Sequence, residues 1–388
     1  MRATLARFGA GAGATVLDPF CGTGTTLVEC KKLGLESVGL EGNPMARFAA
    51  AVKVDWRPAP AGLRRRAAAV VATAAAAGPG RPLPDEAREL LLRGSISARP
   101  LGRALALHER LVAEPPRYRD HLRLALAAAL PTEIGNLRFG PEVGVGPARR
   151  DAPVLGAWRA RVETMAADLE AVAGGRAAPA TVHAADARDA GRRLGPESID
   201  AVVTSPPYPN EKDYTRTTRL ESVLLGFLRT RAELRALKQG LVRSNTRGVY
   251  AVDDDDRFVA DHVEIGRLAA AIEARRLELH KTSGFERLYA RVTRLYFGGL
   301  HRHLAGLRPA LRPGAHLAYV VGDQASFLRV LIPTGRLLAD LADALGYEVC
   351  GLDLFRLRRA TATRSALREE VVVLRWPGPK PRARRAPA

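Results

Sequence analysis

A glycine-rich turn between an apolar strand and a helix, at residues 15–33, constrains the fold of this chain most strongly. Residues 15–20 (TVLDPF) form a short apolar run typical of a buried strand. The turn CGTGTT follows at 21–26, and a helix is expected over 25–33 with Gly34 as its C-cap. Glycines in such a turn let a ligand approach the backbone, and the following helix N-terminus offers unpaired N–H groups. The pattern predicts an α/β sheet with a nucleotide cofactor at this turn.

A second predicted strand, at 37–40, ends in the acidic residue Glu41. An acidic residue at the end of the second strand is placed to accept hydrogen bonds from ribose hydroxyls. Asn43 follows in the loop, and a helix is expected over 45–53. The first turn does not have the spacing GxGxxG, which counts against a dinucleotide.

A proline-rich turn, Ser205-Pro206-Pro207-Tyr208, follows the apolar run at 198–203. The two prolines remove backbone donors and fix φ, so the turn is stiff. It comes at the carboxyl end of a predicted strand, where open α/β sheets bind their ligands. The Ser205 hydroxyl and the Pro206 carbonyl could accept hydrogens from an exocyclic amino group, while the Tyr208 ring could stack on a base. A proline-rich loop with a packed tyrosine is the alternative for these four residues considered alone.

Together, the two turns resemble the S-adenosylmethionine-dependent amino-methyltransferases that act on DNA. Residues 18–26 (DPFCGTGTT) resemble their motif I, and residues 205–208 (SPPY) resemble their catalytic motif IV in the serine form typical of cytosine-N4 enzymes. Motif I precedes motif IV here, whereas the cytosine-N4 enzymes often have the reverse order. The resemblance implies an α/β fold of the class I methyltransferase kind, a Rossmann-like doubly wound sheet with helical insertions.

The same resemblance implies S-adenosylmethionine as the cofactor and assigns residues to the site. An acidic residue after the strand expected at 180–185 would contact the adenine amino group, and Asp186 occupies this position. The expected cofactor-binding residues are Asp18, Pro19, Phe20, Cys21, Gly22, Gly24, Thr25, Thr26, Glu41, Asn43 and Asp186. The expected catalytic residues are Ser205, Pro206, Pro207 and Tyr208.

Alanine-, arginine- and leucine-rich helical segments interrupt the predicted core twice. The expected organisation is core at 1–56, 180–229 and 300–376, helical insertions for target recognition at 57–179 and 230–299, and a basic, disordered tail at 377–388. The first insertion should contain helices at 63–77, 85–93, 101–113 and 118–130 and a glycine-rich loop at 136–146. Later elements expected are helices at 217–227, 287–307 and 334–345, a strand at 315–321, and an antiparallel pair at 348–357 and 370–376.

The chain is strongly basic, with 60 Lys and Arg against 41 Asp and Glu and a formal net charge of +19. This charge favours a nucleic-acid partner, although an arginine- and alanine-rich composition of the kind that GC-rich genomes encode gives the same excess. The acidic run at 253–256 is expected to face solvent or cap a helix. The candidate nucleic-acid contacts are Asp213, Tyr214, Arg216, Arg243, Arg247 and Arg138.

Three functions are compatible with these features. The first is methylation of DNA at cytosine N4, with adenine N6 as the alternative base; a cognate restriction enzyme is then a candidate partner. The second is RNA methylation of the guanine-N2 type, because similar Pro-Pro-Tyr loops occur in such enzymes. The third is a nucleic-acid-binding subunit with a vestigial cofactor fold.

Cysteine spacing and hydropathy bear on location. Cys21, Cys30 and Cys350 are far apart and form no CxxC pair, which argues against a zinc site or a disulfide framework and favours a reducing cytoplasm. No apolar run is long enough to suggest a membrane span. A cytoplasmic protein that does not bind membranes is therefore expected.

Overall fold

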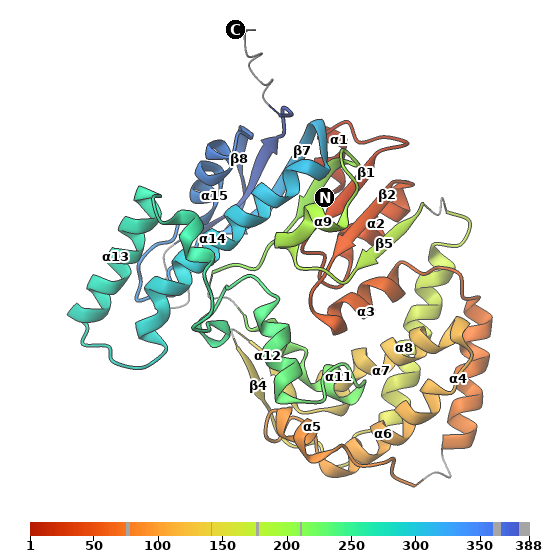
Figure 1. Ribbon diagram of the computed structural model, residues 1–388. Helices are drawn as coiled ribbons and strands as arrows, with labels where there is room; N and C mark the ends of the chain where they lie inside the picture. Colours follow the sequence, from red (N-terminus) through yellow and green to blue (C-terminus); the bar gives the residue numbers. More distant parts are fainter. Residues whose placement is uncertain (75–77, 141, 176–177, 210–211, 360–365, 380–388) are drawn as a thin grey trace.

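A seven-stranded sheet forms the centre of the molecule, with strand order β5-β2-β1-β6-β7-β9-β8 (Figure 1). The computed structural model describes residues 1–74, 78–140, 142–175, 178–209, 212–359 and 366–379. The strands are β1 (Thr15–Asp18), β2 (Glu36–Leu40), β5 (Ala180–His183), β6 (Ile199–Thr204), β7 (Leu311–Gly322), β8 (Glu348–Arg359) and β9 (Ala366–Arg375). Five strands run parallel, and β9 is antiparallel to both β7 and β8. The predicted doubly wound α/β fold and its closing antiparallel pair are confirmed.

Helices cover both faces of this sheet. They are α1 (Arg2–Arg7), α2 (Thr25–Leu33), α3 (Pro44–Lys53), α9 (Ala190–Arg193), α14 (Tyr289–Leu307) and α15 (Thr334–Ala344). Alternation along the strands separates two apolar layers. Val16 and Val203 pack with Leu5 of α1, whereas Leu17 and Val202 belong to the larger core under α14 and α15. Helix α1 was not expected, because the sequence appeared to lead directly into the first strand.

The first insertion folds as a helical bundle. It contains α4 (Pro60–Ala74), α5 (Asp85–Leu90), α6 (Ala98–Val112), α7 (Pro116–Ala129), a π-helical turn (Leu130–Ile134) and α8 (Val154–Ala171). Trp158 is fully buried among these helices, and its indole N–H donates to the Leu122 carbonyl at 2.9 Å. The loop expected at 136–146 instead contains a two-stranded hairpin, β3 (Leu137–Phe139) and β4 (Val143–Val145). Residues 75–77 of the first expected helix and 380–388 of the expected disordered tail lie outside the described residues.

The segment after β6 is divided into short helices. These are α10 (Tyr214–Thr217), α11 (Arg219–Leu224), α12 (Arg231–Gln239) and α13 (Val263–Glu278). Short 3-10 turns occur at Ala187–Asp189, Thr246–Gly248, Asp255–Val259, Glu286–Leu288 and Arg308–Ala310. The single helix expected at 217–227 is therefore α10 and α11, and the boundary expected at 299/300 falls inside α14. Across the described ranges, every helix is too short or too polar to span a membrane.

The acidic run at 253–256 departs from its expected exposure. Asp255 is only 3% exposed, and its carboxylate bonds with Arg188 and Arg302. The backbone at Asp255 lies directly on helix α14 at Gly298, where a Cβ would overlap the Asp255 carbonyl. The expectation of a solvated run is wrong for Asp255, because the buried Arg188 and the half-buried Arg302 compensate its charge.

We predict that Gly298→Ala lowers the free energy of unfolding by about 1–3 kcal/mol, because the added methyl group must displace the Asp255 backbone. Gly266→Ala in α13 is the matched control, since a Cβ there meets no atom within 4 Å. The control should leave stability unchanged or raise it by up to about 1 kcal/mol, since alanine is the better helix former. Urea denaturation of both variants measures the difference, and equal stabilities would contradict the packing described for Asp255.

Candidate functional site

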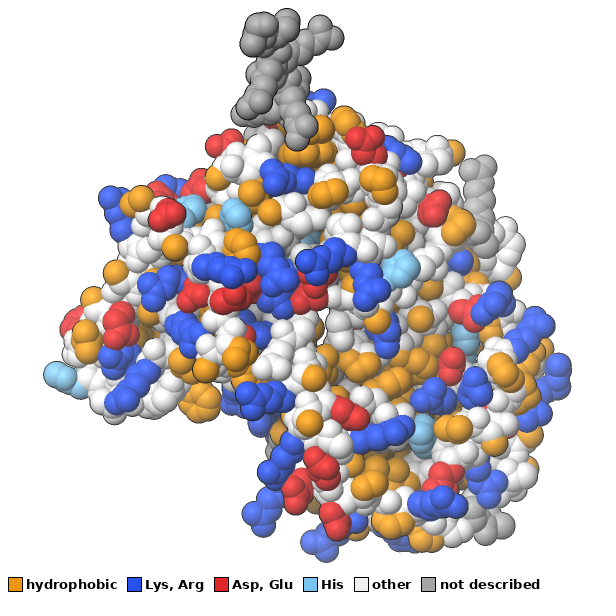
Figure 2. All heavy atoms as spheres, in the orientation of Figure 1, with side chains coloured by type: hydrophobic (Ala, Val, Ile, Leu, Met, Phe, Trp, Pro, Cys, Tyr) orange, Lys and Arg blue, Asp and Glu red, His pale blue; other side chains and the backbone are white. Residues whose placement is uncertain are grey.

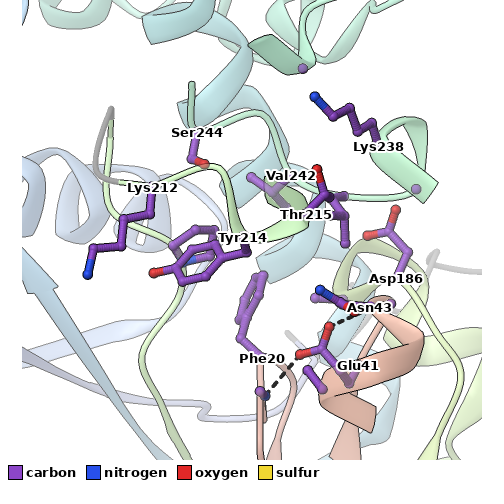
Figure 3. A pocket seen from close by; sticks show the side chains of 18 of the residues that line it. Phe20, Glu41, Asn43, Asp186, Lys212, Tyr214, Thr215, Lys238, Val242 and Ser244 are labelled. Carbon is purple, nitrogen blue, oxygen red and sulfur yellow. Dashed lines mark hydrogen bonds between the residues drawn. The ribbon is translucent and has the colours of Figure 1, made fainter. Parts of the chain in front are cut away.

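A cavity of about 450 Å³ opens at the carboxyl edge of the sheet, where β1, β2, β5 and β6 end. The turns after these strands line it together with the segments 212–218 and 238–248 (Figure 3). Both turns singled out in the sequence thus meet in one cavity. The predicted residues that line it are Pro19, Phe20, Gly22, Glu41, Asn43, Asp186, Ser205, Pro207, Asp213, Tyr214 and Arg243.

Asp18 links the two turns from beneath the cavity. Its Oδ1 accepts hydrogen bonds from the Thr204 hydroxyl at 2.6 Å and from the Phe20 backbone N–H at 3.1 Å. Thr204 ends β6, directly before Ser205, so this one carboxylate sets the spacing between the turns. Burial raises the pKa of Asp18, although hydrogen bonds from Thr204, Thr26 and Phe20 oppose the shift. Asp18 therefore supports the predicted cofactor turn without lining the cavity.

Glu41 extends across the glycine turn. Its carboxylate accepts the Gly22 N–H at 2.9 Å and the Asn43 N–H at 2.6 Å. Gly22 and Gly24 have φ of +53° and +86°, and a Cβ at Gly24 would come within 2.9 Å of Ala50. Only glycine fits this turn without strain. Burial raises the pKa of Glu41 to about 7, against the two backbone hydrogen bonds that lower it.

The other predicted residues of the first turn hold its shape. The Cys21 N–H donates to the Leu40 carbonyl at 3.1 Å, and its buried thiol has a pKa raised by burial and by the Asp18 and Glu41 carboxylates. Thr25 begins α2, and Thr26 is buried beside Asp18. The buried side chains of Cys21 and Thr26 support the cavity from behind, whereas Thr25 is exposed and outside the cavity lining.

Asp186 is held by its neighbour Arg188. The Arg188 Nε lies 3.0 and 2.9 Å from the two Asp186 oxygens. The same buried guanidinium bonds with Asp255 and, at 3.3 Å, with the Gln239 carbonyl at the end of α12. The segment 240–248, which lines the cavity, begins directly after this residue. Arg188 therefore connects Asp186, at the carboxyl edge of the sheet, to the segment 240–248 of the cavity wall.

The Ser205 side chain is exposed to the cavity, and Tyr208 lies behind it. The Tyr208 hydroxyl donates to Glu369 at 2.9 Å and is close enough to the Ser205 hydroxyl for that group to lower its pKa. Burial and the Glu369 carboxylate raise the pKa of Tyr208, so the phenol keeps its proton. Because the Tyr208 proton is given to Glu369, the Tyr208 oxygen can act toward Ser205 only as an acceptor, and the Ser205 lone pairs remain available.

The stacking contact predicted for Tyr208 lacks support in this conformation. Its ring lies 5.4 Å from the Arg358 guanidinium and outside the cavity lining. The aromatic rings that do line the cavity are Phe20 and Tyr214, and Tyr214 is 46% exposed (Figure 3).

Two of the predicted nucleic-acid residues hold the segments over the cavity. Asp213 accepts from the Lys238 ammonium at 3.1 Å and from the Thr215 hydroxyl at 2.6 Å. Burial alone would raise the pKa of Asp213, but these partners outweigh it and lower the pKa. Arg243 is 4% exposed and pairs with Asp253 at 2.7 Å. The phosphate contact predicted for Arg243 is thus without support, because its guanidinium faces inward.

Three further predicted contacts lie outside the lining. Arg216 is half-buried on α10, and Arg138 is exposed on β3. Arg247 is also exposed, 3.5 Å from Glu142. The structure does not bring these three arginines to the cavity, and their contact with nucleic acid stays a prediction.

His303 is a site residue that the sequence did not indicate. Its Nδ1 donates to the Ala187 carbonyl at 2.8 Å, and its Nε2 accepts from the Tyr319 hydroxyl at 2.7 Å. Burial lowers the pKa of His303 to about 4, so the ring is neutral. It packs edge-on against Phe20 at 5.0 Å and thereby fixes both sides of the cavity floor. Helix α14 contains two histidines, His301 and His303, and nothing in the helix pattern distinguished His303.

Comparisons with known proteins support a methyltransferase. The model of a DNA methylase family (the N6/N4 type) matches residues 7–50, which contain β1, the glycine turn, α2, β2 and Glu41. No curated protein matches the sequence. Two structures of the rRNA methyltransferase aviRa from Streptomyces viridochromogenes align with 96% of this chain and 81% of theirs, at 14% and 15% identity and TM-scores of 0.31 and 0.30. Structural similarity at these TM-scores is too low to assign a function to this protein.

We predict that S-adenosylmethionine affinity falls as the pH drops below 7, because Glu41 then gains a proton and loses acceptor capacity for ribose hydroxyls. Full affinity is expected above pH 7, and the dissociation constant should rise by up to about tenfold per pH unit below it. Calorimetric titration between about pH 5.5 and 8.5 measures this dependence. Glu41→Gln should bind weakly with little pH dependence; an equally flat profile for the wild-type protein would contradict the role of Glu41.

Proposed function

We propose that this protein transfers a methyl group from S-adenosylmethionine to the exocyclic amino group of a nucleic-acid base, with cytosine N4 in DNA as the first substrate. The observation that carries this proposal is a single cavity that joins Glu41 and Asp186 to Ser205. The first two residues suit a nucleoside cofactor, and Ser205 suits an amino group. The DNA methylase match over residues 7–50 supports the cofactor half.

The residues of the cavity fit S-adenosylmethionine. Glu41 offers carboxylate oxygens for ribose hydroxyls, and Asp186 offers them for the adenine amino group. Leu40, Ala185 and Val242 add apolar surface for the flat purine. When bound, this cofactor supplies an electrophilic methyl group on a sulfonium, which is an excellent leaving group. The task left to the protein is to orient the amine and exclude water.

The loop at 205–208 can hold the amine. The Ser205 hydroxyl is exposed to the cavity, and its lone pairs can accept one amino hydrogen. Pro206 is buried and outside the cavity lining, so its carbonyl is the proposed acceptor for the other hydrogen only if the loop turns toward the base. The hydrogen bond from Tyr208 to the Glu369 carboxylate polarises the Tyr208 hydroxyl and makes its oxygen a better acceptor for the Ser205 hydroxyl. With both hydrogens bound, the nitrogen lone pair is directed at the methyl group.

Direct transfer also agrees with the cysteines. A covalent route through a base carbon would need a thiolate beside the base. Cys21 and Cys30 are buried with raised pKa values, and Cys350 is exposed on β8, so none of them lines the cavity. A target base in duplex DNA would have to be flipped out to reach Ser205.

The proposal is tested by incubating the protein with S-adenosylmethionine carrying a labelled methyl group and, in parallel, with unmethylated DNA and bulk tRNA. Digestion then identifies the labelled nucleoside. Label in N4-methylcytosine supports the first substrate, and label in N6-methyladenine moves the proposal to adenine. Label in tRNA alone replaces DNA with RNA, and absence of label together with absence of cofactor binding contradicts methyl transfer.

We predict that Ser205→Ala lowers kcat by about 10- to 100-fold, the loss expected when one hydrogen bond to the reacting amine is removed. Affinity for S-adenosylmethionine should change little. Ser198→Ala is the matched control, because Ser198 lies at the opposite end of the β6 region and its hydroxyl donates to the Gly195 carbonyl at 2.7 Å, outside the cavity lining. Single-turnover rates and calorimetric titration separate the two quantities, and equal losses in both would reduce Ser205 to a support of the fold.

A further inference from the structure

Strand β8 exposes apolar and basic side chains along the edge of the sheet. Leu354, Phe355 and Leu357 are 49%, 60% and 60% exposed, and Arg356 and Arg359 lie beside them. Single exposed apolar residues are common on protein surfaces, but such a row on one strand marks a binding surface. None of these residues lines the cavity.

This part of β8 adjoins the Ser205 loop through Glu369. The Glu369 carboxylate accepts from the Tyr208 hydroxyl at 2.9 Å and from Arg356 at 2.7 Å. Arg358 approaches the same carboxylate at 3.3 Å and lies over the Tyr208 ring. The arginines of β8 are thus one side chain away from the tyrosine that contacts Ser205.

The surface of the hairpin at this end is basic. Arg356, Arg359 and Arg368 reach solvent, whereas the nearby carboxylates of Glu369 and Glu370 are only 5% and 7% exposed. The carboxylates of Glu369 and Glu370 pair with Arg356 and Arg368 and orient their guanidinium groups, which keep donors exposed to solvent. Figure 2 shows basic side chains gathered in a band on the sheet half of the molecule, beside the groove between the two halves.

The backbone of β8 is poorly suited to pairing with a second copy of the chain. Its register with β9 shifts twice, between Val349 and Gly351 and between Leu354 and Arg356. Irregularities and charged side chains on an edge strand are the features that prevent strand addition. The side chains, rather than the backbone, are therefore the binding groups of this surface.

We propose that β8 binds the backbone of the nucleic-acid strand that carries the target base. Arg356 and Arg359 contact phosphates, and Phe355 packs on a neighbouring exposed base. Arginine beside an aromatic ring is the combination that single-stranded nucleic acid recognises without sequence preference. This inference rests on the proposed function, because the strand bound at β8 is the one whose base would reach Ser205.

Fluorescence anisotropy with a labelled DNA single strand of about 20 nucleotides, and with RNA of the same sequence, tests this surface across a range of salt concentrations. Arg356→Ala and Arg359→Ala should each weaken binding about fivefold near 0.1 M salt and reduce the slope of log K against log salt by about 0.7. Phe355→Ala should weaken binding by about fivefold or more with the slope unchanged. Lysine at either arginine position should restore the slope, which a merely structural role would not explain.

Arg375→Ala is the matched control, because it removes the same charge from the other end of the hairpin, where Arg375 pairs with Glu348. It should behave as the wild-type protein, and S-adenosylmethionine affinity should be the same in Arg359→Ala and Arg375→Ala. If the β8 variants match Arg375→Ala while the wild-type protein methylates nucleic acid, the β8 surface is refuted and the proposed function stands. If the wild-type protein binds neither strand, the β8 surface is refuted, and the methyl-transfer assay decides the proposed function separately.

Discussion

The hydrogen bond between the Asp18 carboxylate and the Thr204 hydroxyl, at 2.6 Å, is the contact on which the site depends. It joins the ends of two adjacent parallel strands, so the turn that begins at Pro19 and the loop that begins at Ser205 leave the sheet from a common point. A buried carboxylate is costly unless it is hydrogen-bonded, and the Thr204, Thr26 and Phe20 donors meet this need. Loss of any of these hydrogen bonds would disturb both turns together, because one carboxylate connects them. The two turns therefore act as one wall of the cavity.

Buried charge pairs extend this arrangement outward. Arg188 forms ion pairs with Asp186 and Asp255, and the Glu369 carboxylate accepts hydrogen bonds from Tyr208 and Arg356. The first set ties the cofactor edge to the segment over the cavity, and the second ties the Ser205 loop to the outermost strands. Such pairs contribute less to stability than to a unique arrangement, because desolvation offsets most of their attraction. Among the described residues, the buried basic side chains are Lys31, Arg188, Arg219 and Arg243, so most of the basic charge lies at the surface. The arginines of β8 are the part of that surface that we assign to a nucleic-acid partner.

Local signals were sufficient to predict the sheet and both turns. Short apolar runs bounded by glycine or proline located β1, β2, β6 and the helix α2 to within a residue or two. The partners of charged residues could not be predicted in the same way. Asp255 and Glu369 acquire them from segments distant in sequence, and Arg243 pairs with Asp253 across an irregular loop that has no periodic pattern. For the same reason the inward orientation of Arg243, the role of His303 and the position of Tyr208 behind Ser205 became visible only once the helices were packed.

A structure of the protein with S-adenosylhomocysteine, the product of methyl transfer, tests most directly whether the two turns form one site. We predict that the ribose hydroxyls bind Glu41, that the purine lies beside Asp186 and that the thioether sulfur faces the Ser205 loop. A ligand bound elsewhere, or one with its sulfur directed away from Ser205, would contradict the central claim that the edge joined by Asp18 and Thr204 is a methyl-transfer site.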